Sequence, residues 1–319
     1  MTNRPAGSPP TGLPWAEAAA DPQRLLGTDA YGPGEVAGHG RRGPTLRVVR
    51  RSDGLRVAVK VGPPLDGDRP RKQFLEGAGT LRSLYALPGL ARLIDFGVGP
   101  GGLPWVARPW YDGPSAEESL VSHNLRVGEV TEAGRSAAAA LAALHARGLL
   151  HANLTPGCLL RDSHGDWWVD GVAIEGLGPV SGGRPDEPPP SHVPPEVLEG
   201  SPWSVAGDAW ALGSCLSTLL SGTPPWARQA AQGRASLLLA MTTGQADPPA
   251  RPDLPAWLAD LVASCLRPDA AARPTLAEVA AAIERASPVE PATAQPAARA
   301  EEGRPLGSSY LLDAPIGSG

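Results

Sequence analysis

The ten residues HANLTPGCLL, His151 to Leu160, are the part of this 319-residue chain that most strongly indicates its fold. They follow an Ala- and Leu-rich run of helical period that ends at Gly148, a typical helix stop signal. They precede the polar segment DSHGDWWVDG. The stretch therefore lies in a loop behind a long helix. Its side chains Asn153, Thr155 and Cys158 determine whether the loop can support catalysis.

The composition excludes several classes of protein. A hydrophobic content of 42% with 19% charged residues is typical of a globular chain. A net charge of −5 without a basic run argues against nucleic acid or an anionic membrane as the main partner. No apolar run reaches the roughly 18 residues of a membrane span, and MTNRPAGSPP does not resemble a signal peptide. Since its three cysteines lack metal or disulfide spacing, we expect a cytoplasmic protein without bound metal.

The pattern along the chain predicts an α+β fold with two lobes. Strand-like segments and one helix come first and predict a small antiparallel β lobe over about 24–108. Helix-like segments dominate a larger lobe over about 109–286. The predicted strands lie within 31–62, 90–98 and 103–110, and the predicted helices at 71–85, 128–148, 206–221, 254–266 and 275–286.

The remaining segments are rich in Pro, Gly and Ala. Residues 1–23 predict a disordered N-terminal tail, residues 178–195 a mobile loop, and residues 287–305 a linker. Residues 306–319 return to an apolar pattern, which is taken up again below.

A glycine-rich segment, GHGRRGPT, lies between two of the predicted strands. Gly38, Gly40 and Gly43 would let the backbone approach and donate N–H groups to phosphates. Arg41 and Arg42 at its tip could neutralise phosphate charge, although two solvated loop arginines are the simpler interpretation. Lys60 follows Gly43 by seventeen residues. It is one of only two lysines in the chain, so its place in a motif carries weight.

Over about residues 30–286 the chain resembles the protein kinase superfamily, in particular the bacterial serine/threonine kinases. HANLTPGCLL is similar to the catalytic loop H-R-D-L-x-x-x-N, and the segment after it to the approach to D-F-G. VPPEV (193–197) resembles the A-P-E motif, and GDAWALGSCLSTLLSGTPPW (207–226) and CLRPDAAARPTLAEV (265–279) resemble two later conserved segments. The resemblance implies the two-lobed kinase fold, with ATP as the cofactor to expect.

The structural residues of the family have counterparts here. The resemblance implies that Glu196 pairs with Arg273 to anchor the activation segment, and that Asp208 holds the backbone of the catalytic loop. His151 would join the two lobes. These four residues predict an intact scaffold.

The chemical residues are changed. Asn153 replaces the catalytic base, Thr155 replaces a lysine, and Cys158 replaces a metal-binding asparagine, although Mg²⁺ prefers oxygen ligands. Counting forward without a gap places Gly171 on the metal-binding aspartate. A one-residue deletion would instead place Asp170 there. On a strand the two positions face opposite sides, so only one alignment can hold.

Two changes affect the small lobe. The helix glutamate that should pair with Lys60 falls on Gly77, and Glu76 lies about 100° around the helix, so we expect Lys60 to lack its usual partner. Arg108 stands at the gatekeeper position beside the adenine pocket. It either fills the pocket or extends towards solvent without a role.

These observations predict a pseudokinase: a catalytically impaired, kinase-like regulatory or scaffolding module that binds ATP with weak or no Mg²⁺ dependence. One alternative is a divergent serine/threonine kinase or other ATP-dependent transferase that uses Asp170 and Asp166 for metal. Another is a kinase-fold interaction domain without any ligand. The partner would be a protein. Because RPLGSSYLLDAPIGSG (304–319) is similar to the first strand of another kinase small lobe, an active kinase domain in tandem is one candidate.

Overall fold

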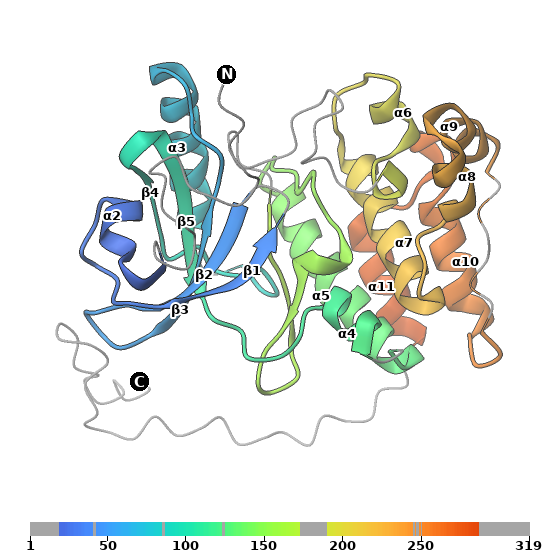
Figure 1. Ribbon diagram of the computed structural model, residues 1–319. Helices are drawn as coiled ribbons and strands as arrows, with labels where there is room; N and C mark the ends of the chain where they lie inside the picture. The colour runs from blue at the N-terminus through green and yellow to red at the C-terminus, as the bar shows by residue number, and fades with distance from the viewer. Residues whose placement is uncertain are drawn as a thin grey trace, which may run out of the picture.

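The computed structural model of the protein describes residues 19–40, 43–84, 87–122, 125–172, 190–244, 246, 249 and 251–286. The described residues form two lobes, with a β-sheet in one and a helical bundle in the other (Figure 1). The predicted α+β architecture with a small antiparallel lobe and a larger helical lobe is therefore confirmed.

The small lobe is built on one antiparallel sheet in which neighbouring strands pair in the order β1-β2-β3-β5-β4. A turn ending in Asp53-Gly54 joins β2 to β3, and Gly54 takes the left-handed φ of 72° that this turn requires. The strands are β1 Glu35–Gly40, β2 Gly43–Val49, β3 Arg56–Val61, β4 Asp95–Gly99 and β5 Leu103–Pro109.

The two faces of this sheet bury different residues. Alternate residues of β2, β3 and β5 form an apolar core, to which helix α2 (Pro22–Leu26) adds Leu25 and Leu26. On the opposite face, helix α3 (Asp68–Ser83) packs through Phe74 and Ala78 beside Val106. The rest of this second face, which carries Lys60, is left for the large lobe.

The predicted start of the folded domain at residue 24 is too late. Helix α2 begins at Pro22, and Ala19 before it has no exposed surface. Its burial beside the sheet core outweighs the loop-like composition of this segment. Residues 1–18 lie outside the described residues, as do the linker and residues 304–319.

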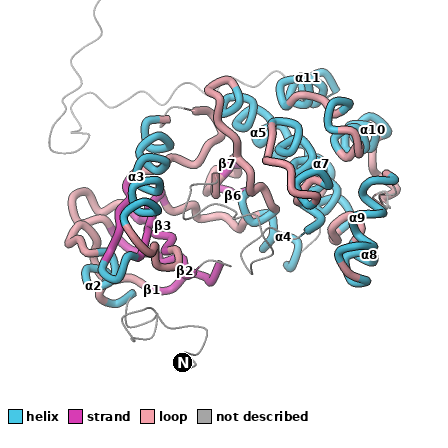
Figure 2. The backbone as a smooth tube through the Cα atoms, turned by 90° about the horizontal axis from the view of Figure 1, so that it is seen from above, coloured by secondary structure: helices cyan, strands magenta, loops and turns pink. Residues whose placement is uncertain are grey.

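The large lobe surrounds helix α7, which is buried along almost its whole length. A two-stranded hairpin, β6 with β7, lies between the sheet and the helices (Figure 2). The four helices predicted for this lobe are present, whereas α4, α6, α8, α9 and the hairpin were not predicted. The elements are α4 Ala116–Ser122, α5 Val127–His145, β6 Leu159–Arg161, β7 Trp167–Val169, α6 Pro195–Leu198, α7 Val205–Ser221, α8 Ala227–Gln232, α9 Arg234–Thr243, α10 Ala256–Cys265 and α11 Leu276–Ala286.

The loop predicted for 178–195 is shorter than expected at its C-terminal end. Residues Pro190–His192 form a short 3-10 helix, in which Ser191 and His192 are buried. Residues 173–189 lie outside the described residues. Among the described helices, none is long and apolar enough to cross a membrane.

The predicted pair between Glu196 and Arg273 is present and bidentate. Arg273 Nη1 and Nη2 donate to the two carboxylate oxygens of Glu196 at 2.7 and 2.8 Å. The other three N–H groups donate to backbone carbonyls at 2.8, 3.1 and 3.0 Å, so all five donors of the guanidinium are used. The guanidinium also lies 4.8 Å from the ring centre of Trp210, and its side chain has no exposed surface.

Replacing Arg273 with Ala should destabilise the protein strongly, because the Glu196 carboxylate and the carbonyls lose their donors. Breaking one partner of a buried pair costs about 3–5 kcal/mol, or roughly 10 °C in melting temperature for a domain of this size. The matched control is Arg135→Ala, which removes an exposed pair with Glu132 on α5. Equal and small shifts of both variants in thermal denaturation would contradict the anchoring role.

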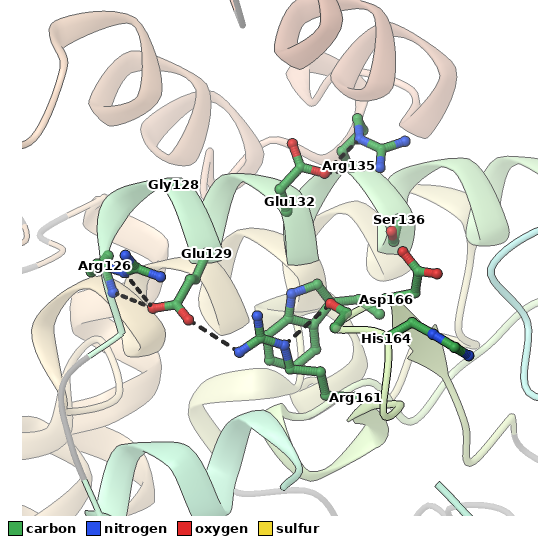
Figure 3. Close-up of a pocket in the computed structure, with 11 residues that line it drawn as sticks. Arg126, Gly128, Glu129, Glu132, Arg135, Ser136, Arg161, His164 and Asp166 are labelled. Atoms are coloured by element: carbon green, nitrogen blue, oxygen red, sulfur yellow. Dashed lines mark hydrogen bonds and ion pairs between the residues drawn. The ribbon is translucent and has the colours of Figure 1, made fainter. Parts of the chain in front are cut away.

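A second charged network fixes the start of α5 (Figure 3). The Glu129 carboxylate accepts from the backbone N–H of Arg126 at 3.0 Å, from Arg126 Nε at 3.3 Å and from Arg161 Nη1 at 3.1 Å. The hydrogen bond from the Arg126 backbone is the largest cause that lowers the pKa of Glu129, to about 2. These residues line a hollow of about 580 Å³. Its lining is mostly charged and already paired, unlike the apolar pockets that bind small molecules.

The lowered pKa of Glu129 predicts a specific pH dependence. Its contribution to stability is complete above the ordinary value of 4.5 and disappears as the pH falls towards about 2. Glu129→Gln should lower the free energy of unfolding at pH 7 by about 1–3 kcal/mol. Urea denaturation should show this difference shrinking between pH 4.5 and 2. A constant difference would mean that the Glu129 charge is not the cause, and the exposed Glu132→Gln is the control.

Candidate functional site

The catalytic-loop segment is held by the carboxylate of Asp208 at the start of α7. Oδ1 accepts from the backbone N–H of Ala152 at 2.8 Å and from Trp203 Nε1 at 2.9 Å. Oδ2 accepts from the backbone N–H of His151 at 2.8 Å and lies 2.9 Å from His145 Nε2. Ala152 is one of two non-glycine residues with positive φ in the described part of the chain, at 52°. The buried carboxylate thus imposes an uncommon backbone conformation on the loop.

His151 connects this loop to the residue that follows strand β7. Its side chain is completely buried, and burial lowers its pKa, so the ring is neutral. Nδ1 accepts from the backbone N–H of Asn153 at 3.3 Å, which leaves the proton on Nε2 to be donated to the backbone carbonyl of Asp170 at 3.0 Å. His151 therefore has a positioning role between two segments of the site.

The three changed residues of the loop bond to one another and to the backbone. Asn153 Nδ2 donates to the Gly171 carbonyl at 3.1 Å, and Cys158 Sγ donates to the Asn153 carbonyl at 3.3 Å. Thr155 Oγ1 lies 3.5 Å from Cys158 Sγ. Burial raises the pKa of Cys158, so the thiol keeps its proton. None of these three groups is a carboxylate that could accept a proton or bind Mg²⁺.

Residue 171 is the position that faces these groups. A Cβ atom added to Gly171 would lie 3.1 Å from Cys158 Sγ and 3.8 Å from Asn153 Nδ2. Asp170 points elsewhere, and its carboxylate contacts Arg108. The geometry therefore corresponds to the alignment without a gap, in which glycine stands where a carboxylate would face the loop.

Asp170 and Arg108 form an ion pair between the lobes. Arg108 Nε lies 2.7 Å from Asp170 Oδ2, with 17% and 24% of the two side chains exposed. Burial raises the pKa of Asp170, but the charges of Arg108 and Lys60 outweigh it, so the pKa lies below the ordinary value. Arg108 does not extend into solvent, in contrast to the second interpretation of its position.

Lys60 lies on β3, opposite Thr45 of β2 and Val106 of β5. Glu76 pairs instead with Lys72 at 3.8 Å, and 66% of its side chain is exposed. No ion pair of Lys60 is found among the described residues, and the loss of its usual helix partner stays a prediction. Lys60 is near enough to affect the pKa of Asp170 and of His151, so it lies in the same cleft.

The three glycines of the glycine-rich segment differ in what surrounds them. Gly43 has a φ of 151°, and a Cβ there would lie 2.3 Å from the Val61 carbonyl, so only glycine fits. A Cβ at Gly38 would meet nothing within 4 Å. Gly40 ends β1 beside Gly43. Arg41 and Arg42 lie outside the described residues, and their predicted contact with phosphate stays a prediction.

Lys60 is a side chain of the site that could hold a phosphate. Among the described residues, no group of three His, Cys, Asp or Glu side chains is placed to hold a metal ion. Asp166 borders the charged hollow at α5 (Figure 3). Four residues of extended chain, about 13 Å, separate it from Asp170. The use of both aspartates for metal by a divergent kinase therefore stays a prediction.

The comparisons with known proteins agree with this geometry. The family model described as "Protein kinase domain" matches residues 31–282. The serine/threonine-protein kinase PknK of Mycobacterium bovis is 29% identical over 282 residues, which are 85% of this chain and 23% of PknK. The serine/threonine-protein kinase AfsK of Streptomyces coelicolor is 29% identical over 281 residues, which are 82% of this chain and 32% of AfsK.

A solved structure shares the fold. The crystal structure of Rad53 1-466 in complex with AMP-PNP superposes with a TM-score of 0.64 at 20% identity, covering 77% of this chain and 62% of that one. The chain spans about a third or less of the length of PknK and AfsK. Since the family match extends over most of the described residues, the chain belongs to the protein kinase domain family.

Proposed function

We propose that this protein is a pseudokinase: a kinase-like regulatory or scaffolding module that does not transfer phosphate. The observation that carries the proposal is position 171, where glycine faces Asn153 and Cys158. Phosphoryl transfer depends on positioning, on Mg²⁺ and on a group that accepts the substrate proton. At the place where these groups would meet, the described residues offer an amide and a protonated thiol, and neither group is a carboxylate.

The size of the expected loss supports the proposal. A positioned acid or base contributes roughly 10²–10⁴ in rate. Metal stabilisation of the transferred group contributes several kcal/mol more, and each ~1.4 kcal/mol is a factor of ten. Kinases turn over at about 1–100 s⁻¹. Losing both contributions would leave turnovers slower than hours, even though such effects are not additive.

The retained scaffold supports a role in binding. Asp208 holds the loop and Arg273 holds Glu196 with every donor satisfied, so the large lobe keeps its shape without the reacting groups. We propose a protein as the partner, and an active kinase domain in tandem is one candidate. ATP would bind weakly through Lys60 and with little or no help from Mg²⁺. We place this activity in the cytoplasm.

A divergent kinase remains the second candidate, because one observation favours it. The Asp170 carboxylate lies in the cleft, close enough to Lys60 for the lysine charge to lower its pKa. If Asp170 left Arg108, its carboxylate would be available to a cation near Lys60.

The test is transfer of labelled phosphate. The full chain, incubated with radiolabelled ATP, Mn²⁺ and generic protein acceptors, should incorporate no label above background, because no base or metal carboxylate faces the loop. An active bacterial serine/threonine kinase in a parallel reaction confirms the conditions. Label that disappears in Asp170→Ala but persists in Asp166→Ala would establish the divergent kinase and end the pseudokinase proposal.

A further inference from the structure

The ion pair between Arg108 and Asp170 is held firmly at both ends. Arg108 belongs to β5 of the small lobe, and its Nη1 also donates to the Pro109 carbonyl at 3.2 Å. Asp170 follows β7 of the large lobe. Its backbone N–H donates to the Cys158 carbonyl at 2.8 Å, and its own carbonyl accepts from His151 Nε2 at 3.0 Å. The pair thus links two rigid segments, one from each lobe.

Two aromatic side chains extend this contact. The Arg108 guanidinium lies 5.5 Å from the ring centre of Tyr111, and the ring of Trp168 lies 5.7 Å from that of Tyr111 on the segment between the lobes. Trp168 and Asp170 are two residues apart on an extended segment, so their side chains share a face. Trp168 Nε1 donates to Asp162 Oδ2 at 2.9 Å. We call Arg108, Tyr111, Trp168 and Asp170 the hinge cluster.

The hinge cluster adjoins the face of the sheet that carries Lys60. Ala58 is two residues before Lys60 on β3, so it shares the cleft face, and it pairs directly with Arg108 across the sheet. Ala58 is nevertheless only 1% exposed, and Leu160 of the large lobe is 9% exposed. Lys60 beside the apolar side chains of Ala58 and Leu160 would suit a nucleotide, whose phosphate would contact the lysine and whose base would contact the apolar side chains. Those two side chains are, however, already buried.

We infer that the hinge cluster is an internal latch, which closes the hinge end of the cleft to a nucleotide base and joins the two lobes without a ligand. The inference deepens the proposed function and rests on it, because a cleft closed from within belongs to a module that does not turn over ATP. A base could enter only after the Arg108–Asp170 pair had opened. The apparent affinity for a nucleotide is therefore reduced by the fraction of time that the pair is open.

The first test measures binding of a fluorescent ATP analogue to the full chain in EDTA. Arg108→Thr removes the long charged side chain and leaves Asp170 beside Lys60. This variant should bind the analogue about tenfold or more tightly than the wild type. Arg56→Thr is the matched control, because Arg56 pairs with Asp112 at 2.7 Å near the hinge, with 56% and 39% of the side chains exposed. The control should bind as the wild type does.

The second test measures stability instead of binding, so it needs only a measurable melting transition of Arg108→Thr. Asp170→Asn keeps the size of the side chain and removes its charge. A double-mutant cycle of Arg108→Thr and Asp170→Asn should show strongly non-additive shifts in melting temperature, whereas Arg56→Thr with Asp112→Asn should show almost none. Additive shifts in the first cycle, or equal analogue affinity in wild type and Arg108→Thr, would overturn the latch.

These outcomes are separate from those of the phosphate-transfer test. Label incorporation by the wild type would end the pseudokinase proposal whatever the affinity of the variants. Unchanged affinity of Arg108→Thr without label incorporation would remove the latch and leave the pseudokinase proposal in place.

Discussion

The carboxylate of Asp208 is the interaction on which the geometry of the site depends. A buried charge is costly unless hydrogen bonds satisfy it, and Asp208 meets that condition with two backbone N–H groups, the Trp203 indole and His145. Both backbone donors come from the loop. The hydrogen bonds that the buried carboxylate requires therefore fix the path of the chain at His151 and Ala152. The loop keeps this path although the side chains that follow it have changed.

Shape and chemistry are thus maintained by different residues in this fold. Asp208 and Arg273 satisfy buried polar groups of the large lobe, and neither faces Lys60 or Gly171. The Asn153 amide nitrogen and the Cys158 thiol both donate to backbone carbonyls. Substitution at Asn153 or Cys158 therefore need not disturb Asp208 and Arg273, so the fold does not depend on which side chains stand at those loop positions.

The sequence predicted the roles of Asp208 and of the Glu196–Arg273 pair, and it predicted the long helices and strands. It did not predict contacts between distant segments. Arg273 and Glu196 could be found because they lie in motifs whose spacing survives. Helix α4 carried a signal that was overlooked, since Ser115 and Glu118 form a reciprocal cap at its start. The N-cap residue of helix α5 is Arg126, which is not a usual capping residue, so its network with Glu129 gave no such signal.

The ion pair of Arg108 with Asp170 was beyond prediction for a different reason. The two residues are 62 positions apart, and their meeting depends on how the lobes pack. From sequence alone the side on which Asp170 points was open, because two alignments were available. Backbone pairing of β6 with β7 and the direction of the Gly171 Cβ provide the information that spacing lacks.

The close fit of Gly171 against Cys158 limits what a single substitution at position 171 could achieve. A carboxylate at position 171 would have to adopt a left-handed φ of 80°, which favours glycine, with its Cβ 3.1 Å from the sulfur. That separation obliges the thiol to move, and the thiol is tied to Asn153 and Thr155. An engineer who wished to build a metal-binding carboxylate into this loop would therefore have to redesign several positions together.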